Sequence, residues 1–173
     1  MTTHDATTVA DHTDFAPMEA WDAIAAGYDE FVAPGEASFA TEALGRVALR
    51  PGRRFLDVAA GPGGLSLPAA RLGADVLATD WSPAMVERLQ VRASDEGLGR
   101  VEARVMDAHV LDLAGDQFDV TGSEFGVMLV PHQPAALREM VRVTRPGGRV
   151  LLVTYGPPAK SRRCSTSSPR WPS

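Results

Sequence analysis

The apolar and polar positions between residues 54 and 154 follow two patterns in alternation. Short apolar runs of strand length are separated by segments in which apolar residues recur at helical spacing. The predicted strands are about residues 54–58, 74–79, 101–106, 118–122 and 149–154, and predicted helices begin near residues 63, 83 and 134. This alternation predicts an α/β fold with a doubly wound, mainly parallel sheet, which binds ligands at the carboxyl ends of its strands.

The segment before the first strand has the pattern of two helices. Apolar residues recur at helical spacing at Trp21, Ile24, Tyr28 and Phe31. We expect this amphipathic helix to end at Pro34-Gly35 and a second helix to cover about residues 36–49. Trp21 is expected to be a packing anchor, whereas Tyr28, near the end of its helix, is a candidate for ligand contact.

The first predicted strand runs into a glycine-rich turn, where backbone N–H groups can approach a ligand closely. Ala59, Gly61 and Gly64 have the spacing of a dinucleotide-binding fingerprint whose first glycine is replaced, and Asp80 follows about 20 residues later. The same residues also fit an acid-x-Gly-x-Gly-x-Gly loop that starts at Asp57, again with Ala59 in place of the first glycine. The loop alone leaves both interpretations open.

Composition narrows the class of protein. The 173 residues, 45% apolar and 23% charged, are enough for one well-buried domain. A net charge of −5 argues against a nucleic-acid partner held through its phosphates, and no apolar run approaches the ~18 residues of a membrane span. The polar N-terminus shows no signal peptide, and the single cysteine, Cys164, has no internal disulfide partner. We therefore expect a cytoplasmic protein.

Polar residues end three of the predicted strands, so we expect them at one edge of the sheet. Asp80 closes the second strand, Asp107 the third, and Ser123-Glu124 follow the fourth. A carboxylate at Asp80 can accept two hydrogen bonds from a ribose diol, and Asp107 can accept from an amine such as that of adenine. The alternative for Asp107 is that it only begins a turn or caps the next segment.

Five segments together resemble a known family. They are Leu56–Gly63, Thr79–Met85, Met106–Ala108, Gln117–Val120 and Arg142–Arg149. In order and spacing they resemble the motifs of class I S-adenosylmethionine-dependent methyltransferases, and they are most similar to the small-molecule branch that includes the ubiquinone and menaquinone biosynthesis enzymes. The resemblance covers roughly residues 21–155.

The resemblance implies S-adenosylmethionine as cofactor, a small-molecule methyl acceptor, a Rossmann-like sheet of order 3-2-1-4-5, and a set of cofactor contacts. The implied contacts are Asp57, Ala59, Gly61, Gly63, Asp80, Trp81, Asp107, Ala108 and Ser123. The first four would surround the methionine part, and Ser123 would reach its amine through the backbone. Asp80 would hold the ribose hydroxyls and Trp81 would lie against the adenine. Asp107 and Ala108 would read the adenine edge.

The sequence departs from the family in two places. Ala59 replaces the first glycine of the loop, which is tolerable if its φ is negative. The family continues past the fifth strand with a helix and an antiparallel strand pair, which we expect to be missing here. The apolar edge at residues 150–153 would then be free to pair with a second copy, giving a possible homodimer.

We expect three parts in the chain. Residues 1–17 would be a flexible arm and residues 18–155 the S-adenosylmethionine-binding domain. Residues 156–173 hold four cationic residues, no acid and many Ser and Pro, which predicts a disordered basic tail. We favour an artefactual end on a truncated enzyme over a regulatory arm, and Cys164 would be an incidental exposed thiol. Truncation would impair the activity.

No residue is singled out as catalytic, because methyl transfer mainly requires the acceptor to be held close to the methyl carbon in a dry site. His109, His132 and Glu124 are candidates for a base if the acceptor is a hydroxyl. Two alternative functions remain. One is an NAD-dependent oxidoreductase, for which no Tyr-x-x-x-Lys pair is present, and the other is a non-catalytic S-adenosylmethionine-binding remnant. No metal site is predicted, and the sequence does not identify the acceptor.

Overall fold

The computed structural model describes residues 17–156 and 165–167, and the statements below concern these residues. The predicted arm at 1–17 lies outside them except for its last residue, and so does Cys164. Within the described ranges, no helix is both long enough and apolar enough to cross a membrane.

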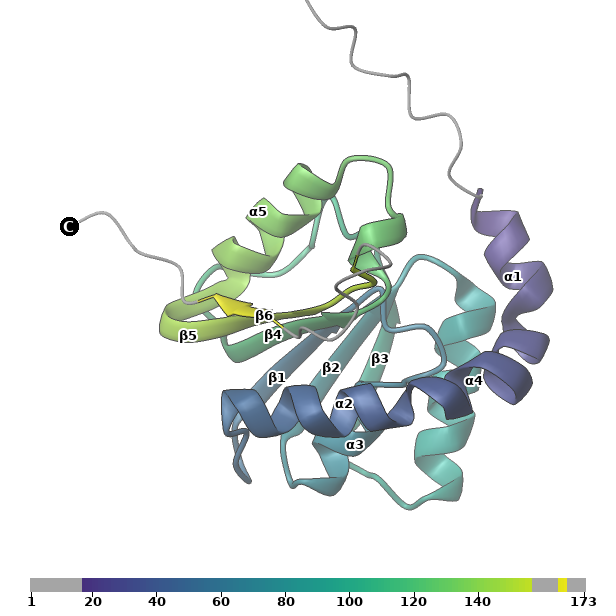
Figure 1. The fold of residues 1–173 in the computed structure, drawn as a ribbon, viewed down its shortest axis with the longest axis horizontal. Coiled ribbons are helices and arrows are strands. Elements are labelled where there is room, and N and C mark those ends of the chain that lie inside the picture. The colour runs from purple at the N-terminus through teal and green to yellow at the C-terminus, as the bar shows by residue number, and fades with distance from the viewer. Residues whose placement is uncertain (1–16, 157–164, 168–173) are drawn as a thin grey trace, which may run out of the picture.

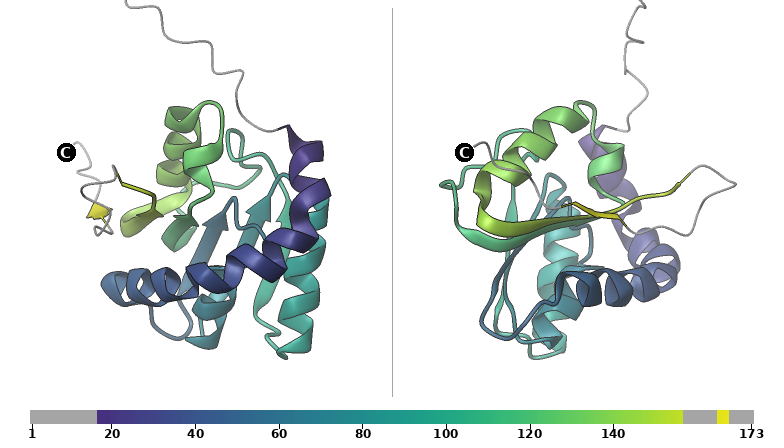
Figure 2. Two further views of the ribbon diagram at one scale, coloured as in Figure 1. Left: turned by 45° about the vertical axis from the view of Figure 1, so that its right-hand side comes forward. Right: turned by 60° about the vertical axis from the view of Figure 1, so that its left-hand side comes forward.

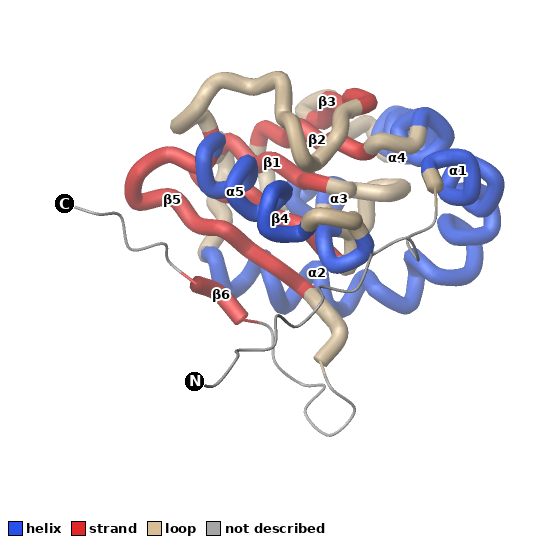
Figure 3. Tube along the Cα trace, turned by 90° about the horizontal axis from the view of Figure 1, so that it is seen from above, coloured by secondary structure: helices blue, strands red, loops and turns tan. Residues whose placement is uncertain are grey.

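The centre of the domain is a sheet whose parallel strands have the predicted order. The strands are β1 (Arg54–Val58), β2 (Asp75–Asp80), β3 (Val101–Val105), β4 (Phe118–Glu124) and β5 (Thr144–Val153). Their order in the sheet is β3-β2-β1-β4-β5, as Figure 1 and the view from above in Figure 3 show. This confirms the predicted α/β class and topology.

The sheet continues beyond β5, where the sequence predicted no further strand. A short strand, β6 (Ser165–Ser167), pairs antiparallel with residues 150–152 of β5. Figure 2 shows it beside β5. The expectations of a missing antiparallel neighbour and of a tail without structure are therefore wrong at these positions, while most of the tail lies outside the described residues. The backbone of β5 is partly paired within the chain, and the homodimer through this edge stays a prediction.

Helices cover both faces of the sheet, which explains why its strands are apolar on both sides. On one face α2 (Ala33–Val47) and α3 (Ser66–Arg71) pack over Phe55 of β1. On the other face α5 (Gln133–Val143) packs over a cluster that contains Leu56 of β1. Figure 1 shows these two layers below and above the sheet. Successive residues of β1 thus serve two separate cores.

The N-terminal segment differs from its prediction. Helix α1 (Met18–Gly27) continues through a wide π-helical turn, Tyr28–Val32, directly into α2. Pro34 does not end the helix because it lies in the first turn of α2, where a missing N–H leaves no hydrogen bond unmade. Ile24 is 48% exposed and Phe31 is 75% exposed, so the predicted apolar stripe is only partly buried.

Helix α1 and the π-helical turn are fixed to α4 (Pro83–Asp95) by acid side chains. Asp22 accepts hydrogen bonds from the Ser82 hydroxyl and from the Ala84 N–H at the start of α4. Asp29 forms ion pairs with Arg88 at 3.2 Å and with Arg92 at 2.8 Å. The contact between α1 and α4 is visible at the right of Figure 2, left panel. These contacts hold the N-terminal helices close to the carboxyl ends of the strands.

Candidate functional site

A pocket lies at the carboxyl ends of β1, β2, β3 and β4, with α1 and the π-helical turn contributing to its wall. Seven of the nine predicted cofactor contacts line it: Asp57, Ala59, Gly61, Asp80, Trp81, Asp107 and Ala108. They come from three loops that are far apart in sequence but adjacent in the sheet. The predicted edge is therefore where these residues meet, and their roles toward a cofactor stay predictions.

The glycine loop is held in shape by backbone bonds. The Ala60 N–H donates to the Thr79 carbonyl at the end of β2, and the Gly63 N–H donates to the Ala60 carbonyl, both at 3.0 Å. Gly61 and Gly63 have φ values of 53° and 96°, which L side chains adopt only with strain. The tight turn inferred from the sequence is present, and it aligns the loop with the end of the neighbouring strand.

Ala59 does not have the negative φ that the sequence argument required. Its φ is 54°, in the left-handed region that costs a non-glycine residue about 1–2 kcal/mol. The loop after β4 passes close to this position, since a methyl group at Gly126 would lie 2.3 Å from the Ala59 carbonyl oxygen. The replacement of glycine by Ala59 is thus a strained feature of the site and not the mild departure we expected.

Asp57 is the most deeply buried carboxylate of the pocket, with 1% of its surface exposed. Its Oδ2 accepts a hydrogen bond of 2.6 Å from the Ser66 hydroxyl, while Oδ1 has no hydrogen-bond partner among the described residues. Burial raises the pKa of Asp57 from 3.8 to about 7. A buried oxygen without a partner disfavours the charged form, and a cationic or N–H group of a ligand would supply what is lacking.

Asp80 is placed by the loops on either side of it. Its Oδ2 accepts from the Gly61 N–H at 2.8 Å and its Oδ1 accepts from the Ser82 N–H at 2.9 Å. Burial nevertheless raises its pKa, since only 8% of the residue is exposed. Each carboxylate oxygen can accept a further hydrogen bond, so Asp80 keeps the capacity to accept two hydroxyl groups.

Asp107 begins a turn and also lines the pocket. Its Oδ1 accepts from the His109 N–H at 2.8 Å and lies 2.6 Å from His109 Nδ1. The turn that was the alternative interpretation is therefore present. Since Oδ1 takes both contacts, Oδ2 remains available to a ligand, and the two interpretations are compatible.

Gly63 and Ser123, the remaining predicted contacts, are not part of the pocket wall. A methyl group at Gly63 would lie 3.0 Å from Leu89 of α4, so this glycine permits close packing behind the loop. Ser123 is 1% exposed, and its hydroxyl accepts from the Val127 N–H at 3.0 Å. Both residues shape the site from behind in this structure, and direct contact with a cofactor stays a prediction.

The pocket also contains a carboxylate that was considered only as a base. Glu124, at the end of β4, has a buried Oε1 without a partner among the described residues. Burial, with added repulsion from Asp57 and Glu36, raises its pKa to about 8. A methyl group at Gly64 would lie 2.9 Å from Glu124 Oε2, so the carboxylate rests against the glycine loop.

Sequence reasoning missed two residues of the N-terminal helices. Glu36 is buried, and its carboxylate accepts from the Tyr28 hydroxyl at 3.1 and 3.3 Å. Trp21, expected only to pack, lines the pocket with its ring centroid 6.3 Å from that of Tyr28. Tyr28, the candidate for ligand contact, also lines the pocket, and that contact stays a prediction. Helical spacing from Tyr28 was the signal that could have found Trp21.

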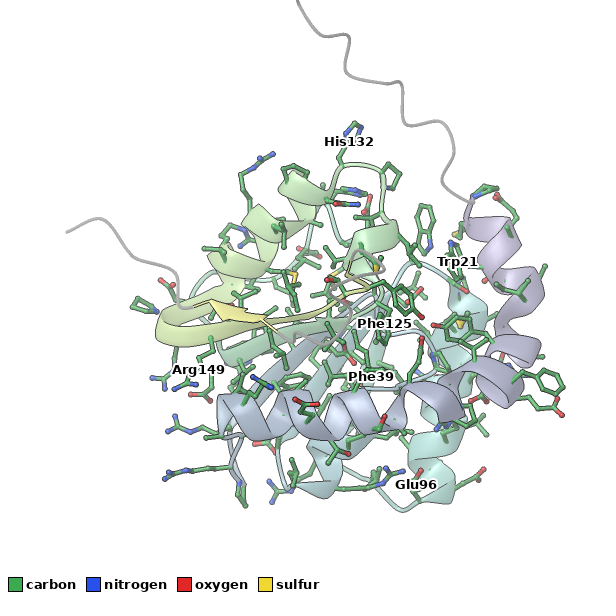
Figure 4. All side chains as sticks on the ribbon, in the orientation of Figure 1. Trp21, Phe39, Glu96, Phe125, His132 and Arg149 are labelled. Atoms are coloured by element: carbon green, nitrogen blue, oxygen red, sulfur yellow. The ribbon has the colours of Figure 1, made fainter. Side chains whose placement is uncertain are left out.

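An aromatic stack closes the wall beside Glu124. Phe125 has a φ of 54°, rare for a bulky side chain, and stacks on Tyr155 with 4.5 Å between ring centroids. Phe39 of α2 meets Phe125 edge-on at 5.6 Å, and Figure 4 shows the two close together. Strained backbone of this kind gathers at functional sites.

The two histidines have different surroundings. His109 lines the pocket, and its Nε2 accepts from the His132 N–H at 3.3 Å while its Nδ1 faces Asp107. His132 is not part of the wall, and Figure 4 shows it on the outer loop, pointing away from the domain. Of the two, only His109 is placed to meet a ligand. No group of three or more metal-ligating side chains occurs within residues 17–156 and 165–167.

Comparison with known proteins identifies the family of this fold and site. A family model described as "Methyltransferase domain" matches residues 55–148, which is more than half of the chain. An uncharacterized protein of Mycobacterium tuberculosis is 46% identical over 105 residues, covering 61% of this chain and 38% of that protein. The demethylmenaquinone methyltransferase of Renibacterium salmoninarum is 38% identical over 117 residues, covering 68% and 46%.

A solved structure agrees with these sequence relatives. Phosphoethanolamine N-methyltransferase 2 of Haemonchus contortus, in complex with phosphomonomethylethanolamine and S-adenosylhomocysteine, superposes with a TM-score of 0.64 at 28% identity, over 69% of this chain and 28% of that one. The chain spans less than half the length of the curated relatives it matches. Fold, motif order and family match agree, and they do not favour the oxidoreductase alternative. The chain belongs to the class I S-adenosylmethionine-dependent methyltransferases.

Proposed function

We propose that the pocket binds S-adenosylmethionine and that the protein transfers its methyl group to a small-molecule acceptor. The observation that carries this proposal is the placement of Asp80. Both of its oxygens are fixed by N–H groups, from the glycine loop on one side and from the start of α4 on the other. That arrangement presents a preorganised carboxylate at the carboxyl end of β2, where a ribose diol can donate to it.

The other pocket residues fit the remaining parts of this cofactor. Asp107 and Ala108 are beside Trp81 in the wall, where an adenine ring can stack and donate from its amine. The unpartnered Oδ1 of Asp57 suits the ammonium group of the methionine part. S-adenosylmethionine carries two positive charges and one negative charge. A wall without Lys or Arg among its described residues suits such a ligand.

The cofactor, when bound, supplies a methyl group activated by a positively charged sulfur. The protein must hold the acceptor next to that methyl group and exclude water. Trp21, Tyr28 and Phe125 provide an apolar surface for this purpose at the mouth of the pocket. A small-molecule acceptor is supported by the named relatives, a demethylmenaquinone methyltransferase and a phosphoethanolamine methyltransferase.

Calorimetric titration of the full chain tests the proposal. We expect S-adenosylmethionine and S-adenosylhomocysteine to bind and NAD to give no heat of binding. The matched control is Asp75→Asn at the opposite, exposed end of β2, which removes a carboxylate without touching the pocket. Binding of NAD with no response to either sulfur compound would overturn the proposal.

A further inference from the structure

The pocket holds more acidic groups than the cofactor proposed above requires. Five acids line it: Glu36, Asp57, Asp80, Asp107 and Glu124. Ribose, adenine and the methionine ammonium engage the three aspartates in that proposal. The two glutamates remain, and no Lys or Arg lies in the described part of the wall to balance them.

The two glutamates come from elements that meet only in the folded chain. Glu36 lies in the first part of α2, and Glu124 ends β4. Their charges act on each other and on Asp57, since Asp57 and Glu36 both raise the pKa of Glu124. A cluster of like charges in a dry pocket is unfavourable unless protons or a bound cation neutralise it.

The buried oxygens show where such a cation is lacking. Asp57 is 1% exposed, lines the pocket, and keeps Oδ1 without a partner among the described residues, and the ammonium group of the cofactor would take that atom. Glu124 Oε1 is a second buried oxygen in the same condition. Native proteins seldom leave buried acceptors unpaired, so these two atoms indicate donors supplied from outside the chain.

Aromatic residues lie next to both glutamates. Tyr28 donates its hydroxyl group to Glu36, and Phe125, which follows Glu124 in the chain, stacks on Tyr155. Trp21 stands edge-on to Tyr28 in the same wall. Carboxylates framed by aromatic faces form a favourable environment for an organic ammonium group, through charge-assisted hydrogen bonds and cation–π attraction.

We propose that the methyl acceptor is an amine, bound as an ammonium ion between Glu36 and Glu124 against the rings of Tyr28 and Phe125. This inference rests on the proposed function and adds the substrate class. Anionic acceptors are disfavoured by the acids in the wall, and neutral hydroxyl acceptors leave the negative charges unpaired.

The methyl transfer balances in atoms, electrons and protons with the groups present in the pocket. The ammonium ion favours the charged form of the neighbouring Glu124 carboxyl group, and the ionised carboxylate takes one proton from it, which leaves a neutral nitrogen with a free electron pair. That pair forms the new bond to the methyl carbon while the carbon–sulfur bond breaks, and the electrons of the broken bond stay on sulfur. The nitrogen again carries a positive charge, the sulfur becomes a neutral thioether, and the proton on Glu124 passes to water. Glu124 would thus be the catalytic residue and Glu36 would bind the substrate charge.

The test compares charged and neutral ligands of the same shape. Calorimetry first measures S-adenosylhomocysteine binding to the full chain. With that ligand saturating, 2-phenylethylamine is compared with 2-phenylethanol, and hexylamine with hexan-1-ol. We expect at least one amine to bind about tenfold more tightly than its alcohol, as a charge-assisted hydrogen bond implies.

Variants assign the preference to the two glutamates. Glu124→Gln and Glu36→Gln keep shape and should bind S-adenosylhomocysteine, while losing the preference for the amine. Glu102→Gln, on the exposed side of β3, is the control and should keep it. The inference is overturned if neither amine is preferred, or if the preference survives in both glutamine variants. Absence of S-adenosylhomocysteine binding in the parent would instead overturn the proposed function itself.

Discussion

The substitution Asp57→Asn tests the electrostatic state of the pocket. Asparagine keeps the shape of the side chain and can still accept the hydrogen bond from the Ser66 hydroxyl, but it cannot ionise. In the parent, burial raises the pKa of Asp57 from 3.8 to about 7. An ionised Asp57 therefore costs the folded state about 4 kcal/mol when no ligand is bound.

The sign of the pH dependence of stability follows from the upward shift of the Asp57 pKa in the folded state. An acid whose pKa is higher in the folded state favours folding at low pH, and that contribution is lost as the pH rises from 3.8 through about 7. Between about pH 5.5 and about pH 8.5 the parent should lose about 2 kcal/mol of unfolding free energy because of Asp57. The Asp57→Asn variant should lose about 2 kcal/mol less over the same range.

Urea unfolding followed by tryptophan fluorescence, without ligand, measures this difference at both pH values. The asparagine amide carries a buried N–H₂ group with a cost of its own, so the change with pH is compared within each protein. Asp75→Asn, which removes an exposed carboxylate paired with Arg100, should follow the parent. Parallel pH dependences in the parent and Asp57→Asn would refute the reasoning.

Four further substitutions separate effects on ligand binding from effects on folding stability. Asp80→Ala should weaken S-adenosylhomocysteine binding by about 1.5–3 kcal/mol with the fold intact. Asp119→Ala frees the Arg54 N–H and the Arg53 guanidinium, so it should lower the unfolding free energy by about 1–3 kcal/mol. Equal ligand affinity in Asp80→Ala and the parent would contradict the predicted role of Asp80 in binding. Ala59→Gly should raise the unfolding free energy by about 1 kcal/mol, because Ala59 has a φ of 54° that glycine adopts without strain. A lower unfolding free energy in this variant than in the parent, measured by urea unfolding, would contradict strain at Ala59. Gly126→Ala should cost about 1–3 kcal/mol, since its methyl would meet the Ala59 carbonyl, and a variant as stable as the parent would disprove that contact.

The parallel sheet and its functional edge could be predicted because they depend on local pattern. Short apolar runs marked strands that are buried on both faces, and the acids that ended them had to meet at one edge. Asp80 and Asp107 were found in this way, and the structure places both in the pocket. The cap at Ser82, whose hydroxyl accepts from the Met85 N–H, was likewise a local signal.

The parts that were missed depend on contacts between distant segments. Glu36 had no signal of its own, because its burial depends on how α2 packs against the sheet and against β5 in particular. Pro34 was interpreted as a helix end, since the sequence alone did not reveal a π-helical turn just before it. The positive φ of Ala59 occurs where the loop at Gly126, distant in sequence, approaches it closely, and no local pattern marks that approach. Strand β6 lies in a segment without apolar alternation, and it pairs antiparallel with β5.

A crystal structure of the protein with S-adenosylhomocysteine tests the central claim most directly. The account predicts the ribose hydroxyls at Asp80, the adenine between Trp81 and Asp107, and the amino group of the homocysteine part within hydrogen-bond distance of Asp57 Oδ1. A nucleoside bound away from Asp80, or one that leaves Asp57 Oδ1 unpartnered, would contradict it.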